Sequence, residues 1–257
     1  MELHFFKYQG TGNDFILVDN REGLIVLGKE QIARLCDRRF GIGSDGFILI
    51  ERDIETHFHM NFFNPDGSQS FCGNGSRCAV AFFRSLGHAD NHVTFRAIDG
   101  LHEAEITDQE VQILMRDVKE VKLEEQGYFI HTGSPHLLCF KDNLDELNVV
   151  ESARIVRYND QWKKDGVNVN YIEVLAPGEI TVRTYERGVE DETWSCGTGV
   201  TAAALAYHHA HGGFNQVEVH TKGGRLSVRF EYSGDGRYTR IWLCGSAVFV
   251  FNGSIEI

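Results

Sequence analysis

Two cysteines of this 257-residue chain stand in nearly the same local sequence, at positions 72 and 196. Cys72 begins the stretch CGNG and Cys196 begins CGTG, and each stretch runs into a segment of helical composition. A thiol before the first turn of a helix faces N–H groups that lack intrahelical acceptors, and it faces the positive end of the helix dipole. Both effects stabilise a thiolate, so we predict that these two cysteines do acid/base chemistry.

The size of the helix effect decides whether such a thiol is a usable base at neutral pH. A cysteine with a pKa of about 8.5 is only a few per cent thiolate, whereas one lowered to about 7 is half ionised. A helix terminus contributes roughly 0.3 to 2 kcal/mol, which lowers a pKa by at most about 1.5 units. The N-terminus of a helix alone is therefore sufficient to make such a cysteine a usable base at neutral pH. The other cysteines lack this setting and are predicted to be buried apolar residues: Cys36, Cys78, Cys139 and Cys244.

Two equivalent thiols indicate a reaction with two matching roles. A thiol hydrolase uses one cysteine as nucleophile and a different residue type as base, so a second equivalent cysteine has no role in it. Inversion at a carbon atom needs a base that removes a proton and an acid that delivers a proton to the opposite face. A thiolate and a thiol meet that need, so the pair favours stereoinversion.

The common spacing of the two motifs extends beyond the cysteines and indicates an internal duplication. Seven residues of the segment 72–106 recur, without a gap, at the same offset in the second half of the chain. In each copy a helical segment ends at glycine and is followed by two alternating strands around a glycine turn. We therefore predict an α+β protein of two similar halves, joined near residues 116–127.

Composition and the remaining motifs narrow the class of protein. A formal net charge of −12 argues against nucleic-acid binding. The sequence shows neither a secretory signal nor a run near the roughly 18 apolar residues of a membrane span, so a cytoplasmic protein without a membrane partner is expected. The stretch GIGSDG at 41–46 follows a helical pattern and enters a strand, the reverse of a dinucleotide site. Histidines 208, 209 and 211 lack further ligands at suitable spacing, so no metal site is predicted.

The motifs taken together resemble the diaminopimelate epimerases, a family of enzymes that work without pyridoxal phosphate. The resemblance rests on stretches that follow in order along nearly the whole chain: GTGNDF, GIGSDG, FNPDGSQSFCGNGSRC, TGSPHLL, VNVNYIEV and YERGVEDETWSCGTGVTA. It implies interconversion of LL- and meso-diaminopimelate, a small-molecule substrate, in the bacterial route to lysine and peptidoglycan precursors. It also implies that no cofactor is used.

The resemblance further implies a fold and an assembly. Each of two pseudo-symmetric α+β domains would be a curved, barrel-like mixed sheet around a central helix, with the active site in the cleft between them. The last strand would return to the first domain. The domains would then be residues 1–117 plus 246–257, carrying Cys72, and residues 118–245, carrying Cys196. Such enzymes are commonly homodimers.

Site residues follow from the same resemblance. Cys72 and Cys196 would be the acid/base pair, assisted by His136 and Glu186. An arginine that contacts a carboxylate through two hydrogen bonds, together with amide groups, can bind and orient an amino-acid substrate. The residues expected to bind substrate are Asn13, Asn64, Gly73, Asn74, Asn168, Glu186, Arg187, Gly197 and Thr198.

Three positions depart from the family pattern. Gly46 stands where some relatives have glutamine, and Ser134 stands where many have asparagine. Glu186 and Cys196 are ten residues apart, one more than in many relatives. Other functions stay open on the sequence: a proline or hydroxyproline racemase-like enzyme, an isomerase of the phenazine-biosynthesis type, a non-catalytic amino-acid-binding module and a thiol hydrolase.

Overall fold

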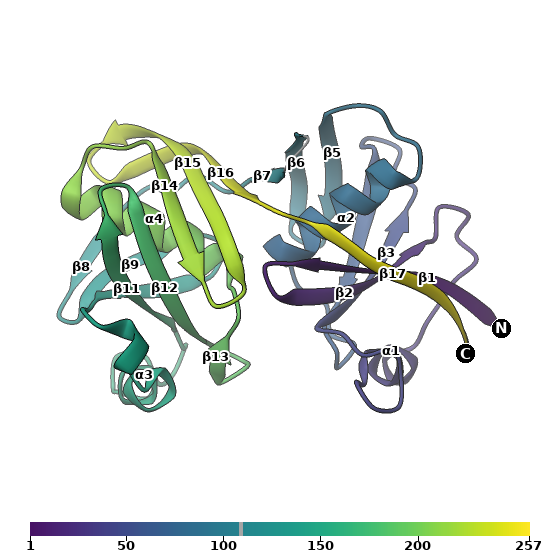
Figure 1. The fold of residues 1–257 in the computed structure, drawn as a ribbon, viewed down its shortest axis with the longest axis horizontal. Coiled ribbons are helices and arrows are strands. Elements are labelled where there is room, and N and C mark those ends of the chain that lie inside the picture. Colours follow the sequence, from purple (N-terminus) through teal and green to yellow (C-terminus); the bar gives the residue numbers. More distant parts are fainter. Residues whose placement is uncertain (108–109) are drawn as a thin grey trace. The chain divides into compact units, whose positions relative to one another are not determined.

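The computed structural model describes residues 1–107 and 110–257, and these residues form two compact units. Unit 1 comprises residues 1–113 and 245–257, and unit 2 comprises residues 114–244. Each unit is a curved mixed sheet with one long helix packed against many of its strands (Figure 1). The predicted α+β class with two similar units is confirmed. Across the described residues, no helix is both long and apolar enough to cross a membrane.

Unit 1 alternates strands with two helices and ends with the last strand of the chain. In chain order its elements are β1 (Glu2–Gly10), β2 (Asn13–Asp19), α1 (Lys29–Cys36), β3 (Gly46–Glu51), β4 (Phe58–Phe63), α2 (Gly73–Ser85), β5 (His92–Ala97), β6 (Gly100–Ile106), β7 (Val111–Leu114) and β17 (Val248–Glu256). Strand β17 pairs antiparallel with β1 over nearly its whole length.

Unit 2 has a similar order of elements. They are β8 (Lys122–Glu124), β9 (Gly127–His131), β10 (Pro135–Phe140), a 3-10 turn η1 (Leu144–Glu146), α3 (Val149–Arg157), β11 (Asn168–Ala176), β12 (Glu179–Glu186), β13 (Asp191–Thr193), α4 (Gly197–His211), β14 (Gln216–Thr221), β15 (Gly224–Gly234) and β16 (Arg237–Gly245).

The strand pairings repeat between the two units. In unit 1 the pairs β1–β2, β3–β4 and β5–β6 are antiparallel, while β2–β3 and β4–β5 are parallel. In unit 2 the corresponding pairs β9–β10, β11–β12 and β14–β15 are antiparallel, while β10–β11 and β12–β14 are parallel. Parallel neighbours need a crossover. The crossovers contain α1 and α2 in unit 1 and α3 and α4 in unit 2, so the duplication is visible in the topology.

The number of sheet faces that helices cover explains whether a strand of unit 1 has a continuous or an alternating apolar sequence. Strand β3 reads GFILIE and is buried at every position but the last, because α1 and α2 both pack on it. Strand β4 alternates buried and half-buried residues, as expected for a strand with one covered face. Fully burying one large apolar side chain of this kind contributes roughly 1.5 to 3 kcal/mol, so these runs hold the helices in place.

Helix α4 is surrounded by the sheet of unit 2. It packs against β9, β10, β11, β12, β14 and β15. Residues 202–206 are completely buried, and four of these five are alanine. Small side chains let the strands approach the helix axis closely. The four cysteines predicted to be buried apolar residues are also confirmed, since each is at most 5% exposed.

The close packing of α4 predicts opposite outcomes for two identical substitutions. Ala203 is completely buried, whereas Ala210 on the same helix is exposed. We expect Ala203→Leu to lower the free energy of unfolding by about 1 to 3 kcal/mol through overpacking. Ala210→Leu should change it by less than about 0.5 kcal/mol. Urea unfolding followed by circular dichroism measures both, and equal effects would contradict this packing.

Candidate active site

Cys72 lies at the N-terminus of α2, as the sequence predicts. Its backbone is extended, and its Sγ accepts a hydrogen bond from the backbone N–H of Gly75 at 3.4 Å. The Ser76 hydroxyl donates to the Cys72 carbonyl oxygen at 2.9 Å, which ties the first turn together. Gly73 is the first helical residue and is buried. The thiol of this half-buried cysteine therefore faces the positive end of the helix.

Cys196 is the N-terminal cap of α4, but its sulfur has a different neighbour. The Sγ lies 3.5 Å from Oγ1 of Thr198, and Gly197 is the first helical residue. Thr198 occupies the position that Asn74 occupies in the first copy. The predicted placement of both cysteines at helix N-termini is confirmed, while their side-chain surroundings have diverged.

Two asparagines predicted to bind substrate are held together in unit 1. Asn74 Nδ2 donates to Asn13 Oδ1 at 2.5 Å, and Asn13 Nδ2 donates to Asp45 Oδ2 at 3.1 Å. The guanidinium of Arg77, which is completely buried in α2, donates to Asn74 Oδ1 at 2.9 Å and to Thr11 Oγ1 at 3.1 Å. Both ends of each amide are thus engaged, so each amide has one defined orientation.

Asp45 belongs to the GIGSDG stretch, and a cluster of charges holds it. Arg38 bridges Asp45 and Asp14 at 2.8 and 2.6 Å. The buried Lys7 pairs with Asp14 at 2.6 Å and also donates to the Gly43 carbonyl oxygen. The stretch therefore leads into β3, and its residue Asp45, which is held by these ion pairs, positions Asn13. Sequence reasoning did not identify Asp45 or Arg77, although both lie inside motifs that it singled out.

Asn64 sits in a turn, which is one of the settings expected of asparagine. Its backbone N–H donates to the Ser68 carbonyl oxygen at 2.7 Å, and its Nδ2 donates to Ser68 Oγ at 3.0 Å. Ser70 Oγ donates to Asn64 Oδ1 at 3.3 Å. These bonds shape the segment that leads from β4 to Cys72.

His136 lies in β10, is completely buried and contacts α4. Its Nε2 is 2.9 Å from Thr198 Oγ1, and its Nδ1 is 3.1 Å from Nδ2 of Asn170. Burial lowers the pKa of His136 to about 3. The imidazole is therefore neutral at physiological pH and acts on its neighbours as a hydrogen-bonding group, not as a cation.

Glu186 and Arg187 stand at the end of β12, next to Asn168. Burial raises the pKa of Glu186, and an interaction with the Thr193 hydroxyl partly opposes this. Asn168 Oδ1 accepts from the backbone N–H of Arg187 at 2.8 Å, while its Nδ2 donates to the Pro135 carbonyl oxygen at 3.0 Å. Asn168 thus fixes the backbone where Glu186 and Arg187 leave the sheet. The exposed Arg187 side chain donates to the Asp165 carbonyl oxygen at 2.8 Å.

The three departures from the family pattern have different surroundings. A Cβ atom on Gly46 would lie 2.6 Å from the Phe62 ring, so that ring fills the space a glutamine stem would need. Ser134 is half-buried, and its carbonyl oxygen accepts from the Thr132 N–H at 3.2 Å. Glu190, in the lengthened segment, has a φ of 58°. Its carboxylate accepts hydrogen bonds from α3 and neighbouring residues, namely Arg157, Tyr158 and Tyr185.

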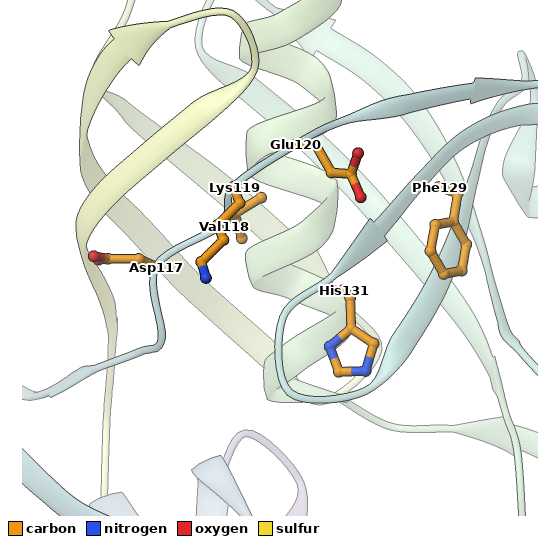
Figure 2. Close-up of a pocket in the computed structure, with 6 residues that line it drawn as sticks. All are labelled: Asp117, Val118, Lys119, Glu120, Phe129 and His131. Atoms are coloured by element: carbon orange, nitrogen blue, oxygen red, sulfur yellow. The ribbon is translucent and has the colours of Figure 1, made fainter.

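A pocket of about 210 Å³ lies in unit 2 beside the turn that precedes β10. It is lined by Asp117, Val118, Lys119, Glu120, Phe129 and His131 (Figure 2). The Asp117 carboxylate points away from the His131 and Phe129 rings (Figure 2). Its lining contains no predicted site residue. In the described part of the chain, no three His, Cys, Asp or Glu side chains form a group that could hold a metal ion.

Comparison with solved structures defines the fold class. A phenazine biosynthesis protein of the PhzF family from Bacillus anthracis matches with a TM-score of 0.76 and 15% identity, covering all of both chains. A probable proline racemase from Agrobacterium radiobacter K84 matches with a TM-score of 0.70 and 14% identity, covering 99% of this chain and 93% of that one. At these identities the similarity establishes the shared α+β fold.

Sequence comparison then identifies the family. The sequence model of the family described as diaminopimelate epimerase matches residues 5–121 and 128–250. A diaminopimelate epimerase from Flavobacterium psychrophilum is 46% identical over 98% of this chain and all of that relative. One from Chlorobaculum tepidum is 41% identical over 96% of this chain and 99% of that relative. The chain therefore belongs to the diaminopimelate epimerase family, which is a family of isomerases.

The charge cluster behind Asn13 predicts a pH-dependent stability. Burial of Asp14 opposes its ionisation, but hydrogen bonds from Arg38 and Lys7 prevail and lower its pKa to about 2 from an ordinary 3.8. A depressed folded-state pKa means that the stabilisation is complete above pH 4 and is lost as the pH falls through 2. We expect Asp14→Asn to lower the free energy of unfolding at pH 7 by about 2 kcal/mol.

Urea unfolding at several pH values measures this effect. The difference between Asp14→Asn and the parent chain should shrink between pH 4 and pH 2. Glu22→Gln is the control, because its pair with Arg52 is about three-quarters exposed on both sides and such pairs contribute little. A constant difference over this range would contradict the assignment.

Proposed function

We propose that this chain interconverts LL- and meso-diaminopimelate without a cofactor, in the formation of lysine and peptidoglycan precursors. One observation carries the proposal: each unit places the cysteine of a duplicated motif at the N-terminus of its long helix. Membership of the family whose relatives bear this name supports the choice of substrate. We also infer that the two compact units are the two duplicated domains.

The proposed reaction moves two protons. The thiolate of one cysteine removes the α-proton, so a C–H bond breaks and an S–H bond forms. The thiol of the other cysteine delivers its proton to the opposite face of the same carbon, and the two sulfurs exchange roles with each turnover. Negative charge develops on the substrate carboxylate when the α-proton leaves. Donors fixed at a helix N-terminus, such as those of the first turns at Gly73 and Gly197, stabilise that charge.

The remaining predicted residues are assigned supporting roles in this proposal. Neutral His136 donates a hydrogen bond near Cys196, and Glu186 holds the reacting ammonium group. The residues that we propose to contact the substrate are the ones predicted from the sequence: Asn13, Asn64, Gly73, Asn74, Asn168, Glu186, Arg187, Gly197 and Thr198. The fixed amides of Asn13 and Asn74 support this view, because a group with one orientation recognises one arrangement of donors and acceptors.

Isotope exchange tests the proposal directly. Incubation of LL-diaminopimelate in D₂O should give the meso isomer with deuterium at the inverted α-carbon, measured by NMR and mass spectrometry. Cys72→Ala and Cys196→Ala should each lower kcat by more than about 10²-fold, the usual contribution of an acid/base group. Cys139→Ala, in the core of unit 2, should leave kcat within about twofold and serves as the control.

Several outcomes would refute this function. If either variant of the two motif cysteines kept full activity, the two-base assignment would be wrong. Turnover of proline or hydroxyproline in preference to diaminopimelate, in a substrate panel, would support the racemase alternative. Calorimetric binding of diaminopimelate without any α-hydrogen exchange would identify a binding module.

We further propose that the chain forms a homodimer through β17. Four consecutive apolar residues of this strand, Val248 to Phe251, are each 45% to 51% exposed. A contiguous exposed apolar segment of this kind is typical of an interaction surface. Because the segment is uncharged and uniform along the strand, it is complementary to itself, as a two-fold interface requires. A second copy of the chain is therefore the occupant that we propose.

The mass of the particle in solution tests this assembly. Light scattering after size exclusion should give about twice the chain mass for the parent protein and the mass of one chain for Val250→Glu, because the new charge would be buried without a partner. Ile155→Glu is the matched control, since Ile155 is 72% exposed on α3, and it should stay dimeric. A monomeric parent protein, or a dimeric Val250→Glu variant, would exclude this interface.

A further inference from the structure

A line of hydrogen-bonding side chains in unit 2 runs from the core to the sulfur of Cys196. We propose that Asn170 is a positioning residue that fixes the tautomer of His136, so that the Thr198 hydroxyl donates a hydrogen bond to the sulfur of Cys196. This inference rests on the proposed function and adds a residue to its machinery. It is carried by four contacts between buried or partly buried groups.

The orientation of the Asn170 amide is determined by its surroundings. Asn170 is completely buried in β11, and its Oδ1 is 2.9 Å from Thr184 Oγ1, which donates to it. Its Nδ2 is 3.3 Å from the carbonyl oxygens of both Leu137 and Asn168. A carbonyl oxygen accepts and cannot donate, so only the NH₂ end can face this side. The NH₂ group therefore also donates to His136 Nδ1, its shortest contact at 3.1 Å.

The position of the His136 proton follows from this donor. A nitrogen that accepts a hydrogen bond carries no proton, so neutral His136 is protonated at Nε2. The neutral state holds over the physiological range, because burial lowers the pKa of His136 to about 3. The Nε2–H group faces Thr198 Oγ1 at 2.9 Å and donates to it.

The direction of the last contact follows in turn. Thr198 Oγ1 accepts a hydrogen bond from His136 Nε2–H, so its own hydroxyl hydrogen points elsewhere, and Cys196 Sγ lies 3.5 Å away. A hydroxyl that donates to a thiolate makes a charge-assisted hydrogen bond, which favours the ionised form. Thr198 is also held from its backbone, since Thr132 Oγ1 donates to its carbonyl oxygen at 2.8 Å. Cys196 thereby gains a donor that adds to the helix N-terminus.

The second glycine of the CGTG motif makes this arrangement possible. A Cβ atom on Gly199 would lie 2.5 Å from Asn170 Oδ1 and 3.3 Å from His136 Cε1. At the duplicated position, a Cβ on Gly75 would make only ordinary contacts at 3.4 Å. The absence of a side chain at Gly199 therefore lets Asn170 and His136 pack against the first turn of α4. The close approach is specific to the second copy.

Two measurements without substrate test the inference. In protein labelled with ¹⁵N-histidine, NMR should show His136 protonated at Nε2 and unprotonated at Nδ1 between pH 6 and 9. Asn170→Asp replaces the NH₂ donor by an acceptor, so a proton should then appear on Nδ1.

Site-resolved alkylation by iodoacetamide reports the thiolate fraction of each cysteine against pH. In Asn170→Asp, the pH at which half of Cys196 is thiolate should rise by about one unit or more, as the loss of one hydrogen bond to a charged group predicts.

Cys72 in the same molecule is the internal control, and its midpoint should not move. Asn148→Asp on α3 makes the same chemical change at a helix cap, where Asn and Asp are equivalent, and should leave both midpoints unchanged. Thr184→Val, which keeps the amide but removes its anchor, should give a smaller shift of the same sign. Asn170→Ala provides a second removal of the donor if Asn170→Asp does not fold.

Kinetics then separate positioning from a structural role. Asn170→Asp should lower kcat by roughly 10- to 100-fold, the effect of one charge-assisted hydrogen bond, with KM changed by less than about threefold. A proton on Nδ1 in the parent protein would overturn the inference, and so would an unchanged Cys196 midpoint in both Asn170 variants. A parent chain with the expected NMR pattern that fails to epimerise diaminopimelate would refute the proposed function alone.

Discussion

The constraint on which both units depend is that a helix inside a curved sheet must begin at a defined residue. Parallel neighbours cannot be joined by a tight turn, so the chain has to cross over between β4 and β5 and between β12 and β14. In both crossovers the helix starts directly after a cysteine in extended conformation. The strands that enclose the helix fix its axis, and they therefore fix where its first turn and the adjacent sulfur lie.

From this shared framework the two units have developed different surroundings for the sulfur. In unit 1 the first-turn residue Asn74 is directed toward Asn13, and Cys72 accepts from a backbone N–H. In unit 2 the corresponding residue is Thr198, whose hydroxyl lies between His136 and the sulfur of Cys196. Equivalent positions in the chain thus support the two cysteines by different chemistry. In the two-base mechanism that we propose, the two cysteines act on opposite faces of one carbon, and different surroundings suit these different roles.

Much of the fold and the placement of the cysteines could be predicted from the sequence, because the signals are local or repeated. Helix starts at CGNG and CGTG depend on a few neighbouring residues, and the duplication multiplies each signal by two. The supporting groups could not be predicted in this way. Asn74 reaches Asn13 across 61 residues and Asn170 reaches His136 across 34, so only the tertiary fold brings these groups together. Likewise, Gly46 alone does not reveal that Phe62 occupies the space beside it.

The frequent use of asparagine in these networks has a physical reason. A carboxylate can only accept and an ammonium group can only donate, whereas an amide does both from opposite ends of one rigid plane. When the partner at one end of an amide is fixed as a donor or an acceptor, the hydrogen-bond direction at the other end is fixed as well. In unit 1 the direction is set by fixed charges at Arg77 and Asp45, and in unit 2 it is set by the hydroxyl of Thr184. In the reaction that we propose, side chains ordered in this way would not have to reorganise as charge develops at the reacting carbon, and such preorganisation lowers a reaction barrier.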